Sequence, residues 1–205
     1  MDITFEEIDI LIDAKRLRFL IKKYLPSSII NMAHQRSVPY SSLNFNACKW
    51  TIENNLLGQM TLLEAVKDIS PSTKIIHLGS LGVLGYRDIK GPIPIGEIET
   101  KFSLENTQEY KTRAHFNHLP DSIYHLSKSL NSSLNDDYLR VHKLNITDVF
   151  QATVWGCNIG ITDDERLNNR LDIDSIYGTV INRFYYQYKG HSQAKNFDPV
   201  GNHYF

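Results

Sequence analysis

Residues 74–85, KIIHLGSLGVLG, carry the strongest fold signal in the chain, because a β-rich run at 74–78 leads directly into a loop with three glycines. A second β-rich run, SIINMA at 28–33, lies upstream. Between the two runs, residues 47–67 place apolar side chains at helical spacing. Strands that alternate with helices are typical of an α/β protein with a parallel sheet, and this is the fold class we predict.

The flanking segments extend this pattern. Residues 17–25 also have helical spacing, and Pro26 ends that helix. Residues 87–119 are polar and contain prolines, so we interpret them as an irregular insertion. The helix at 47–67 is expected to turn an apolar stripe toward the core, made of Trp50, Leu56, Leu57, Met60, Leu63 and Val66.

The second half of the chain continues the alternation of helices and strands. Its predicted elements are a helix at 124–134 capped by Asp121 or Ser122, strands at 138–144 and 151–155, and a helix at 174–190 capped by Asp174 or Ser175.

The composition is that of one globular domain, with 205 residues, 41% hydrophobic and 22% charged, and a formal net charge of −1. Balanced charge argues against binding nucleic acid through a bulk basic field. No apolar run approaches the roughly 20 residues that span a bilayer. The N-terminus lacks a basic signal-peptide front, and Cys48 and Cys157 do not make a disulfide framework. We therefore expect a cytoplasmic protein without a nucleic-acid or membrane partner.

The glycine trio Gly79, Gly82 and Gly85 has the spacing of some dinucleotide loops, but its context does not fit one. A phosphate loop opens a helix, whereas residues 91–94 hold a glycine and two prolines that forbid a regular helix. The first glycine of the chain is Gly58, so no glycine-rich loop precedes it. We expect a loop at the carboxyl end of a strand that presents Ser80 into a cleft.

Tyr124 and Lys128 are four residues apart and share one helix face. A nearby ammonium favours the phenolate and lowers the pKa of a tyrosine from about 10. Such a pair can remove a proton from a substrate alcohol while hydride leaves its carbon, and Ser80 could hold that alcohol. The alternative for Tyr124 and Lys128 alone is a surface helix pair. His115 and His118 lack further ligands at metal spacing, so no metal site is expected.

Ser80, Tyr124 and Lys128 resemble the Ser/Thr–Tyr–Lys set of the extended short-chain dehydrogenase/reductase superfamily, and neighbouring motifs narrow the resemblance to the UDP-sulfoquinovose synthases. These motifs run in the same order from about residue 28 to 191. They are QRSVPYS at 35–41, NN at 54–55 followed by Gly58, GSLG at 79–82, SIYHLSK at 122–128, TD at 147–148 with Gln151, VWG at 154–156, NRLDID at 169–174, and YGT to NRF at 177–184.

The resemblance implies an enzyme that joins UDP-glucose and sulfite with tightly bound NAD. Tyr124 would remove the 4-hydroxyl proton as hydride passes to NAD. Lys128 would lower the pKa of Tyr124 and bind the nicotinamide ribose, and Ser80 would hydrogen-bond the 4-hydroxyl. The resulting 4-ketone acidifies the C5 proton, so that water can leave across C5–C6. Sulfite then adds at C6 and the hydride returns to C4.

Further roles are implied for residues around this set. His125 is a candidate for proton transfer at C5 and C6, or packs beside the tyrosine helix. Arg36 attracts sulfite or contacts substrate, or forms a loop salt bridge. Asn55 lies near the cofactor, or caps or hydrogen-bonds the core. The candidate cofactor contacts are Asn55, Tyr124, Lys128 and Gln151, and the candidate substrate contacts are Gln35, Arg36, Ser80, Gln151, Thr179, Asn182 and Arg183, with an exposed helix charge as the alternative for Arg183.

The chain departs from the family in extent and at a few positions. Residues 1–191 are expected to form a partial Rossmann-like, NAD(P)-binding, three-layer domain that lacks the N-terminal glycine-rich βαβ unit and the C-terminal substrate domain, and 192–205 a divergent tail. His34 stands where Glu is usual, and Ala152 replaces a Gly. We expect weak or no NAD binding by this chain alone.

Three interpretations stay open. The first is a sulfoquinovose-synthase-like enzyme, acting as a homodimer or completed by another polypeptide. The second is another NAD-dependent nucleotide-sugar epimerase or dehydratase. The third is a catalytically inactive truncated fragment.

Overall fold

A computed structural model of the chain describes residues 3–85, 92, 94, 96–103, 109–115, 120–154 and 172–189. Its centre is a parallel sheet of β1 (Ser28–Asn31), β2 (Lys74–Leu78) and β5 (Asn145–Val149), in the order β1-β2-β5. Ile29 pairs with Ile75, and Ile75 with Ile146. The predicted α/β class and the parallel sheet are confirmed.

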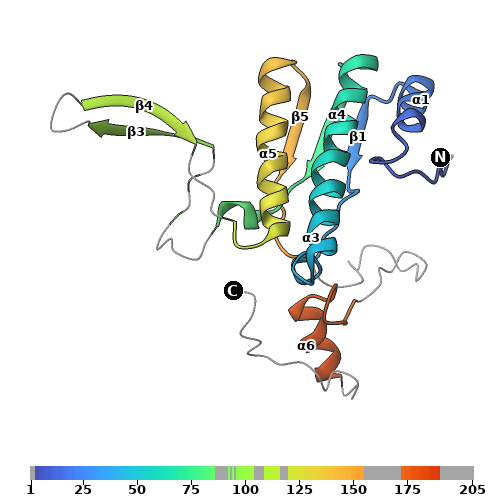
Figure 1. Cartoon of the computed structure of the whole chain (residues 1–205), viewed down its shortest axis with the longest axis vertical. Coiled ribbons are helices and arrows are strands. Elements are labelled where there is room, and N and C mark those ends of the chain that lie inside the picture. Colours follow the sequence, from blue (N-terminus) through green and yellow to red (C-terminus); the bar gives the residue numbers. More distant parts are fainter. Residues whose placement is uncertain are drawn as a thin grey trace.

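The helices follow the chain around this sheet. The longer ones are α1 (Ala14–Tyr24), α3 (Phe45–Ile52), α4 (Gly58–Ile69), α5 (Ile123–Val141) and α6 (Val180–Tyr188), and a π-helical turn η1 (Glu53–Leu57) joins α3 to α4 (Figure 1). The short ones are α2 (Val38–Ser41) and the 3₁₀ turn η2 (Leu81–Leu84).

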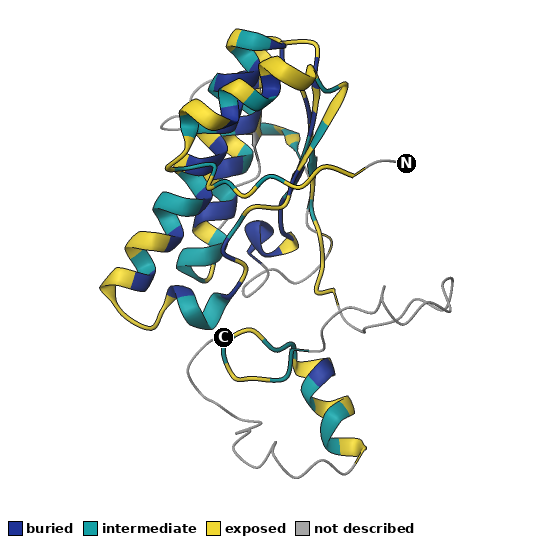
Figure 2. Cartoon of the chain, turned by 90° about the vertical axis from the view of Figure 1, so that its right-hand side faces the viewer, coloured by how far each residue is buried: buried dark blue, intermediate teal, exposed yellow. Residues whose placement is uncertain are grey.

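The sheet has one covered and one open face in the described residues. Figure 2 shows the helices on one side of the strands. On that side Ile75 and His77 are fully buried, whereas Ile30 on the opposite face is 60% exposed. The described residues therefore build two of the three layers that we predicted.

The core lies between the covered face of the sheet and helices α1, α4 and α5. It is held together by branched aliphatic side chains at strand and helix positions that face inward. Its buried members are Leu17, Ile21, Leu62, Leu63, Ala65, Val66, Ile75, Tyr138, Leu144 and Ile146.

The prediction of one apolar stripe along 47–67 was wrong for three of its members. Trp50 is 45% exposed, and Leu57 and Met60 also face outward, whereas Leu63 and Val66 are buried. For Trp50, which precedes η1, the π turn is the reason, because it inserts one extra residue and rotates the helix face before it relative to the face that follows.

Residues 87–119 are not wholly irregular. They contain an antiparallel hairpin of β3 (Glu97–Ser103) and β4 (Glu109–His115), which projects away from the sheet in Figure 1. Phe102 stacks on Tyr110 across the two strands, with ring centres 5.5 Å apart. The charged residues of this hairpin conceal its alternation, which is why the sequence pattern indicated a loop.

Three boundaries in the second half also differ from the prediction. Helix α5 continues to Val141, so the prediction of a strand at 138–144 was wrong. The strand that follows this helix is β5, which begins only at Asn145. Tyr138 is instead a buried helical residue that packs in the core. Residues 151–154 form no strand, and Trp155 lies outside the described residues.

The last helix begins later than predicted and has another cap. The Asp174 carboxylate accepts the backbone N–H groups of Ile176 and Tyr177 and so closes a turn, which competes with helix formation there. Thr179 is the N-cap of α6, and its hydroxyl accepts the N–H of Asn182 at 3.2 Å.

Candidate functional site

Ser80 and Tyr124, which are 44 positions apart in the sequence, meet at the carboxyl end of β2. Ser80 follows the strand directly, and its hydroxyl accepts the backbone N–H of Gly82 at 3.1 Å, which starts η2. Tyr124 lies in the first turn of α5, whose N-cap is Ser122. The Ser80 hydroxyl lies close enough to the Tyr124 phenol to favour its ionised form. The expected serine–tyrosine pair is therefore present.

Lys128 lies one turn further along α5 and is directed into the protein. Its side chain is buried, and Nζ donates a hydrogen bond of 2.6 Å to the carbonyl of Leu78, the last residue of β2. Nζ is 5.9 Å from the centre of the Tyr124 ring. Burial lowers the pKa of Lys128 to about 8, although Asp148 opposes this shift. The surface-pair alternative for Tyr124 and Lys128 is excluded, because Lys128 is buried.

The pKa of Tyr124 differs from our expectation. It is raised from its ordinary value, first because burial disfavours the phenolate, and the nearby Ser80 hydroxyl only partly opposes this. Lys128 does not lower it here. The Lys128 ammonium donates its hydrogen bond to the Leu78 carbonyl. It lies at the distance of a cation–π contact from the Tyr124 ring rather than against the phenol oxygen.

His125 packs against the glycine loop. A Cβ atom at Gly82 would lie 2.2 Å from the His125 ring, so only glycine fits beneath this imidazole. Burial lowers the pKa of His125, with Asp121 acting in the opposite direction. Within the described part of the chain, its buried Nδ1 has no hydrogen-bond partner. The packing alternative is thus observed, and a role in proton transfer stays a prediction.

Asn55 and Gln35 are structural anchors of the loop that follows β1. Asn55 is fully buried; its side-chain oxygen accepts the backbone N–H of Gln35 at 2.7 Å, and its amide donates to the Gln35 carbonyl at 3.0 Å and to Ser127 at 2.9 Å. The Gln35 amide donates to Thr51 at 3.1 Å. The core hydrogen-bond alternative for Asn55 is therefore observed, and contacts of either residue with a ligand stay predictions.

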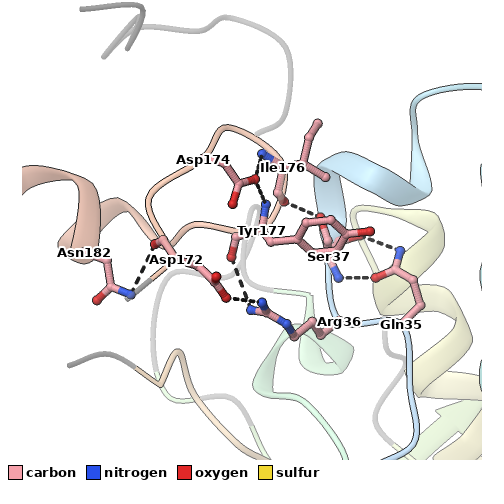
Figure 3. Close-up of polar contacts among 8 residues, drawn as sticks. All are labelled: Gln35, Arg36, Ser37, Asp172, Asp174, Ile176, Tyr177 and Asn182. Carbon is pink, nitrogen blue, oxygen red and sulfur yellow. Dashed lines mark hydrogen bonds and ion pairs between the residues drawn. The ribbon is translucent and has the colours of Figure 1, made fainter. Parts of the chain in front are cut away.

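Arg36 reaches across to the segment that precedes α6 (Figure 3). Its guanidinium forms an ion pair with Asp172, donates to the Tyr177 carbonyl at 3.2 Å and lies 5.4 Å from the centre of the Tyr177 ring. Ser37 beside it donates to the carbonyl of Ile176. The salt-bridge alternative for Arg36 is observed, with a partner 136 positions away.

The remaining predicted substrate contacts belong to two places. Thr179, Asn182 and Arg183 lie at the start of α6, where the Asn182 amide donates to the Asp172 carbonyl at 3.4 Å. Gln151 follows β5 with its side chain exposed, and its carbonyl accepts the N–H of Leu81 at 3.0 Å. Gln151 therefore lies next to the Ser80 loop, whereas the residues of α6 lie on the Arg36 side.

Sequence reasoning missed a group of buried polar residues around Lys128. His77 is fully buried, and its Nδ1 lies 2.8 Å from the Asp148 carboxylate, which also accepts the Ser132 hydroxyl at 2.6 Å. The ring of His34 contacts that of His77 edge to face, at 4.9 Å. Burial lowers the pKa of His34 to about 2, helped by the charges of Lys128 and His77. The sequence signal that could have revealed this group is a polar residue at an inward-facing strand position, such as His77.

The described residues fit only one end of an NAD molecule. Tyr124 and Lys128 are the residues here that could meet the nicotinamide ribose end. The glycine trio does not supply a pyrophosphate cradle, because Gly82 is covered by His125 and η2 has only four residues. In the described ranges, no three His, Cys, Asp or Glu side chains are grouped so that they could hold a metal ion. No helix there is long and apolar enough to cross a bilayer.

Comparisons with known proteins show the family of the chain. The family model described as GDP-mannose 4,6 dehydratase matches residues 1–150. UDP-sulfoquinovose synthase of Sulfolobus acidocaldarius is 27% identical over 185 residues, which are 90% of this chain and 45% of that protein. The chloroplastic UDP-sulfoquinovose synthase of Spinacia oleracea is 31% identical over 176 residues, 84% of this chain and 34% of that protein. The chain thus spans less than half the length of both relatives.

A solved structure supports the fold. UDP-glucose 4-epimerase from Brucella ovis, in complex with NAD, superposes with a TM-score of 0.52 at 24% identity, covering 70% of this chain and 37% of that one. This likeness concerns the fold, and the family follows from the family model that matches residues 1–150. The chain belongs to the GDP-mannose 4,6 dehydratase family, within the NAD-dependent epimerase/dehydratase branch of the extended short-chain dehydrogenase/reductases, and is similar to its UDP-sulfoquinovose synthases.

Proposed function

We propose that this chain acts in NAD-dependent chemistry on a nucleotide sugar, and that the reaction is the joining of UDP-glucose and sulfite to give UDP-sulfoquinovose. One observation carries the proposal: Ser80 and Tyr124 lie together at the carboxyl end of β2, with the Lys128 ammonium 5.9 Å from the centre of the tyrosine ring. The similarity to two UDP-sulfoquinovose synthases supports the choice of substrates.

In this proposal the hydroxyl of the sugar to be oxidised binds between Ser80 and Tyr124. Ser80 orients that hydroxyl, and Tyr124 takes its proton as general base. NAD, when bound, supplies the hydride acceptor. Lys128 provides positive charge beside the phenol and a hydrogen-bond donor for the nicotinamide ribose. Because burial raises the pKa of Tyr124, the phenol depends on this charge and on the substrate to release its proton.

His125 and Arg36 receive different roles. Burial lowers the pKa of His125, so its imidazole is neutral near pH 7 and suited to accept a proton from C5 of a 4-keto sugar. Arg36 already pairs with Asp172. We therefore propose that Arg36 holds the 172–182 segment against the loop after β1 and does not bind sulfite directly. This segment contains Thr179 and Asn182, the candidate contacts to the nucleotide sugar.

The second candidate is a chain that supplies part of this site and is completed by another polypeptide. The observation that favours it is the open face of the sheet, with Ile30 exposed on the outer strand β1. A second polypeptide that covers this face would also supply a cradle for the cofactor's pyrophosphate. A homodimer is a further expectation that the same experiment addresses.

The test is NAD binding by the isolated protein, followed by mass spectrometry of product formed from UDP-glucose and sulfite. Tyr124→Phe should lower turnover by roughly 10²–10⁴-fold, the usual contribution of a positioned proton-transfer group. Tyr188→Phe, at an exposed position of α6, is the matched control and should leave turnover unchanged. If the isolated chain shows no NAD binding and forms no product, the proposal is refuted for the chain alone. The candidate of a site completed by another polypeptide would then remain.

A further inference from the structure

The cluster of Lys128, Asp148, His77 and His34 is distinct from the residues that the resemblance named for catalysis, Lys128 excepted. It gathers one titratable side chain from each of four segments: the loop after β1, then β2, α5 and β5. Burying so many ionisable groups costs free energy unless they compensate one another. We therefore asked what this arrangement does for Lys128, the one member that reaches the candidate site.

The end of β2 links the members of the cluster. His77, Leu78 and Gly79 are consecutive, and each contacts a member of the cluster. The His77 ring lies 2.8 Å from the Asp148 carboxylate, and the Leu78 carbonyl accepts a hydrogen bond of 2.6 Å from the Lys128 ammonium. A Cβ at Gly79 would lie only 2.6 Å from an Asp148 carboxylate oxygen. Glycine at this position leaves the room that Asp148 occupies, so the carboxylate lies beside the strand end whose Leu78 carbonyl accepts the ammonium.

Asp148 is held on both of its oxygens. Oδ1 meets His77 and Oδ2 accepts the Ser132 hydroxyl at 2.6 Å. A carboxylate only accepts hydrogen bonds, so the His77 Nδ1 carries the proton of this contact. Burial raises the pKa of Asp148, but the hydrogen bonds outweigh it and leave that pKa below its ordinary value. A negative charge is thus fixed in the interior near Lys128.

We propose that Asp148, oriented by His77 and Ser132, is the positioning residue that keeps the Lys128 ammonium charged and aimed at the end of β2. The groups that face Lys128 are Asp148 from β5, His34 from the loop after β1 and Tyr124 on its own helix. Asp148 is the anionic one, since the pKa of His34 is about 2 and that of Tyr124 is raised. The proposal rests on the proposed function for its purpose, but its test needs neither NAD nor sugar.

The experiment is an NMR titration of Lys128 in the full chain, with its side-chain signal identified by its loss in Lys128→Met. In Asp148→Asn the hydrogen bonds with His77 and Ser132 can persist and only the charge is lost. The Lys128 midpoint should fall from about 8 by roughly one pH unit, the size expected for loss of a nearby opposite charge. Asp136→Asn is the control, because Asp136 lies on α5 in an exposed pair with Arg140, and it should leave the midpoint in place.

An unchanged midpoint in folded Asp148→Asn, or an equal fall in Asp136→Asn, overturns the proposal. If Asp148→Asn does not fold, the proposal is tested by a titration of the wild-type chain. There the imidazole ¹⁵N signals of His77 should move with the Lys128 titration, since Asp148 connects the two, and insensitive His77 signals overturn the proposal. A chain that passes this test but binds no NAD refutes the proposed function alone, because the titration is independent of ligand.

Discussion

The two sides of the candidate site are held by opposite means. Around Lys128 the polar groups are buried and hydrogen-bonded across β2, β5 and α5, with His77 Nε2 left without a partner in the described part of the chain, and the neighbouring core contains fully buried Leu63. The contacts of Arg36 with Asp172 and Tyr177 are exposed, and α6 turns most of its apolar and aromatic residues to solvent. Buried polar contacts fix a geometry because breaking them leaves unpaired groups, whereas exposed ones exchange with water at little cost. We therefore expect the Lys128 side to hold its geometry more firmly than the Arg36 side.

Truncating an apolar residue on each side should give the largest difference. Leu63→Ala removes a fully buried side chain and should lower the free energy of unfolding by about 2–5 kcal/mol. Ile181→Ala on α6, where the residue is 45% exposed, should cost less than about 1 kcal/mol. Urea unfolding measures both. Equal losses would contradict the comparison.

The pH dependence of stability should report Lys128. Its folded pKa of about 8 lies below the ordinary 10.5, so between these values the unfolded chain binds a proton that the folded chain lacks. Stability therefore rises with pH in this window and loses this gain below pH 8, by roughly 2 kcal/mol between pH 7 and pH 9.5. Lys128→Met should remove the rise in urea unfolding, while Lys49→Met, at an exposed position, should retain it. A wild-type chain without the rise would show that Lys128 titrates normally.

The anchor below the Arg36 loop offers a polar test of the same rigidity. Asn55→Ala leaves the backbone N–H and carbonyl of Gln35 without their partners, and should cost about 1–3 kcal/mol. Asn46→Ala, at an exposed position of α3, is the matched control and should change the free energy of unfolding by less than about 0.5 kcal/mol. A neutral Asn55→Ala would mean that the loop is held elsewhere.

The Arg36–Asp172 pair should give the smallest effect on global stability. The Arg36 side chain is more than half exposed, so a double-mutant cycle with Arg36→Ala and Asp172→Ala should yield a coupling of about 0.2–1 kcal/mol. Hydrogen exchange of the Tyr177 amide should nevertheless quicken in either variant if the pair holds this segment. Unchanged exchange would contradict that role, and a coupling above 2 kcal/mol would place this side with the rigid one.

Local sequence patterns anticipated the elements on which the site stands. The strands near 28–33 and 74–78, the serine after the second strand and the helix that carries Tyr124 and Lys128 all follow from apolar spacing and caps. The π turn at 53–57 was not anticipated, because it arises from how α3 and α4 meet α5 and not from local propensity. The extension of α5 through Tyr138 was missed for a related reason, since core packing overrode the local β preference.

The sequence by itself determined the family, the α/β class and the residue types that meet at the candidate site, since these depend on local spacing and on motifs read in order. Only the tertiary structure decided the state of those residues. The burial that raises the pKa of Tyr124, the pairing of Arg36 with Asp172, and the His77–Asp148 contact beneath Lys128 join positions up to 136 residues apart. Charge, solvation and pairing depend on which groups the fold brings within a few ångströms, and no local pattern records that distance.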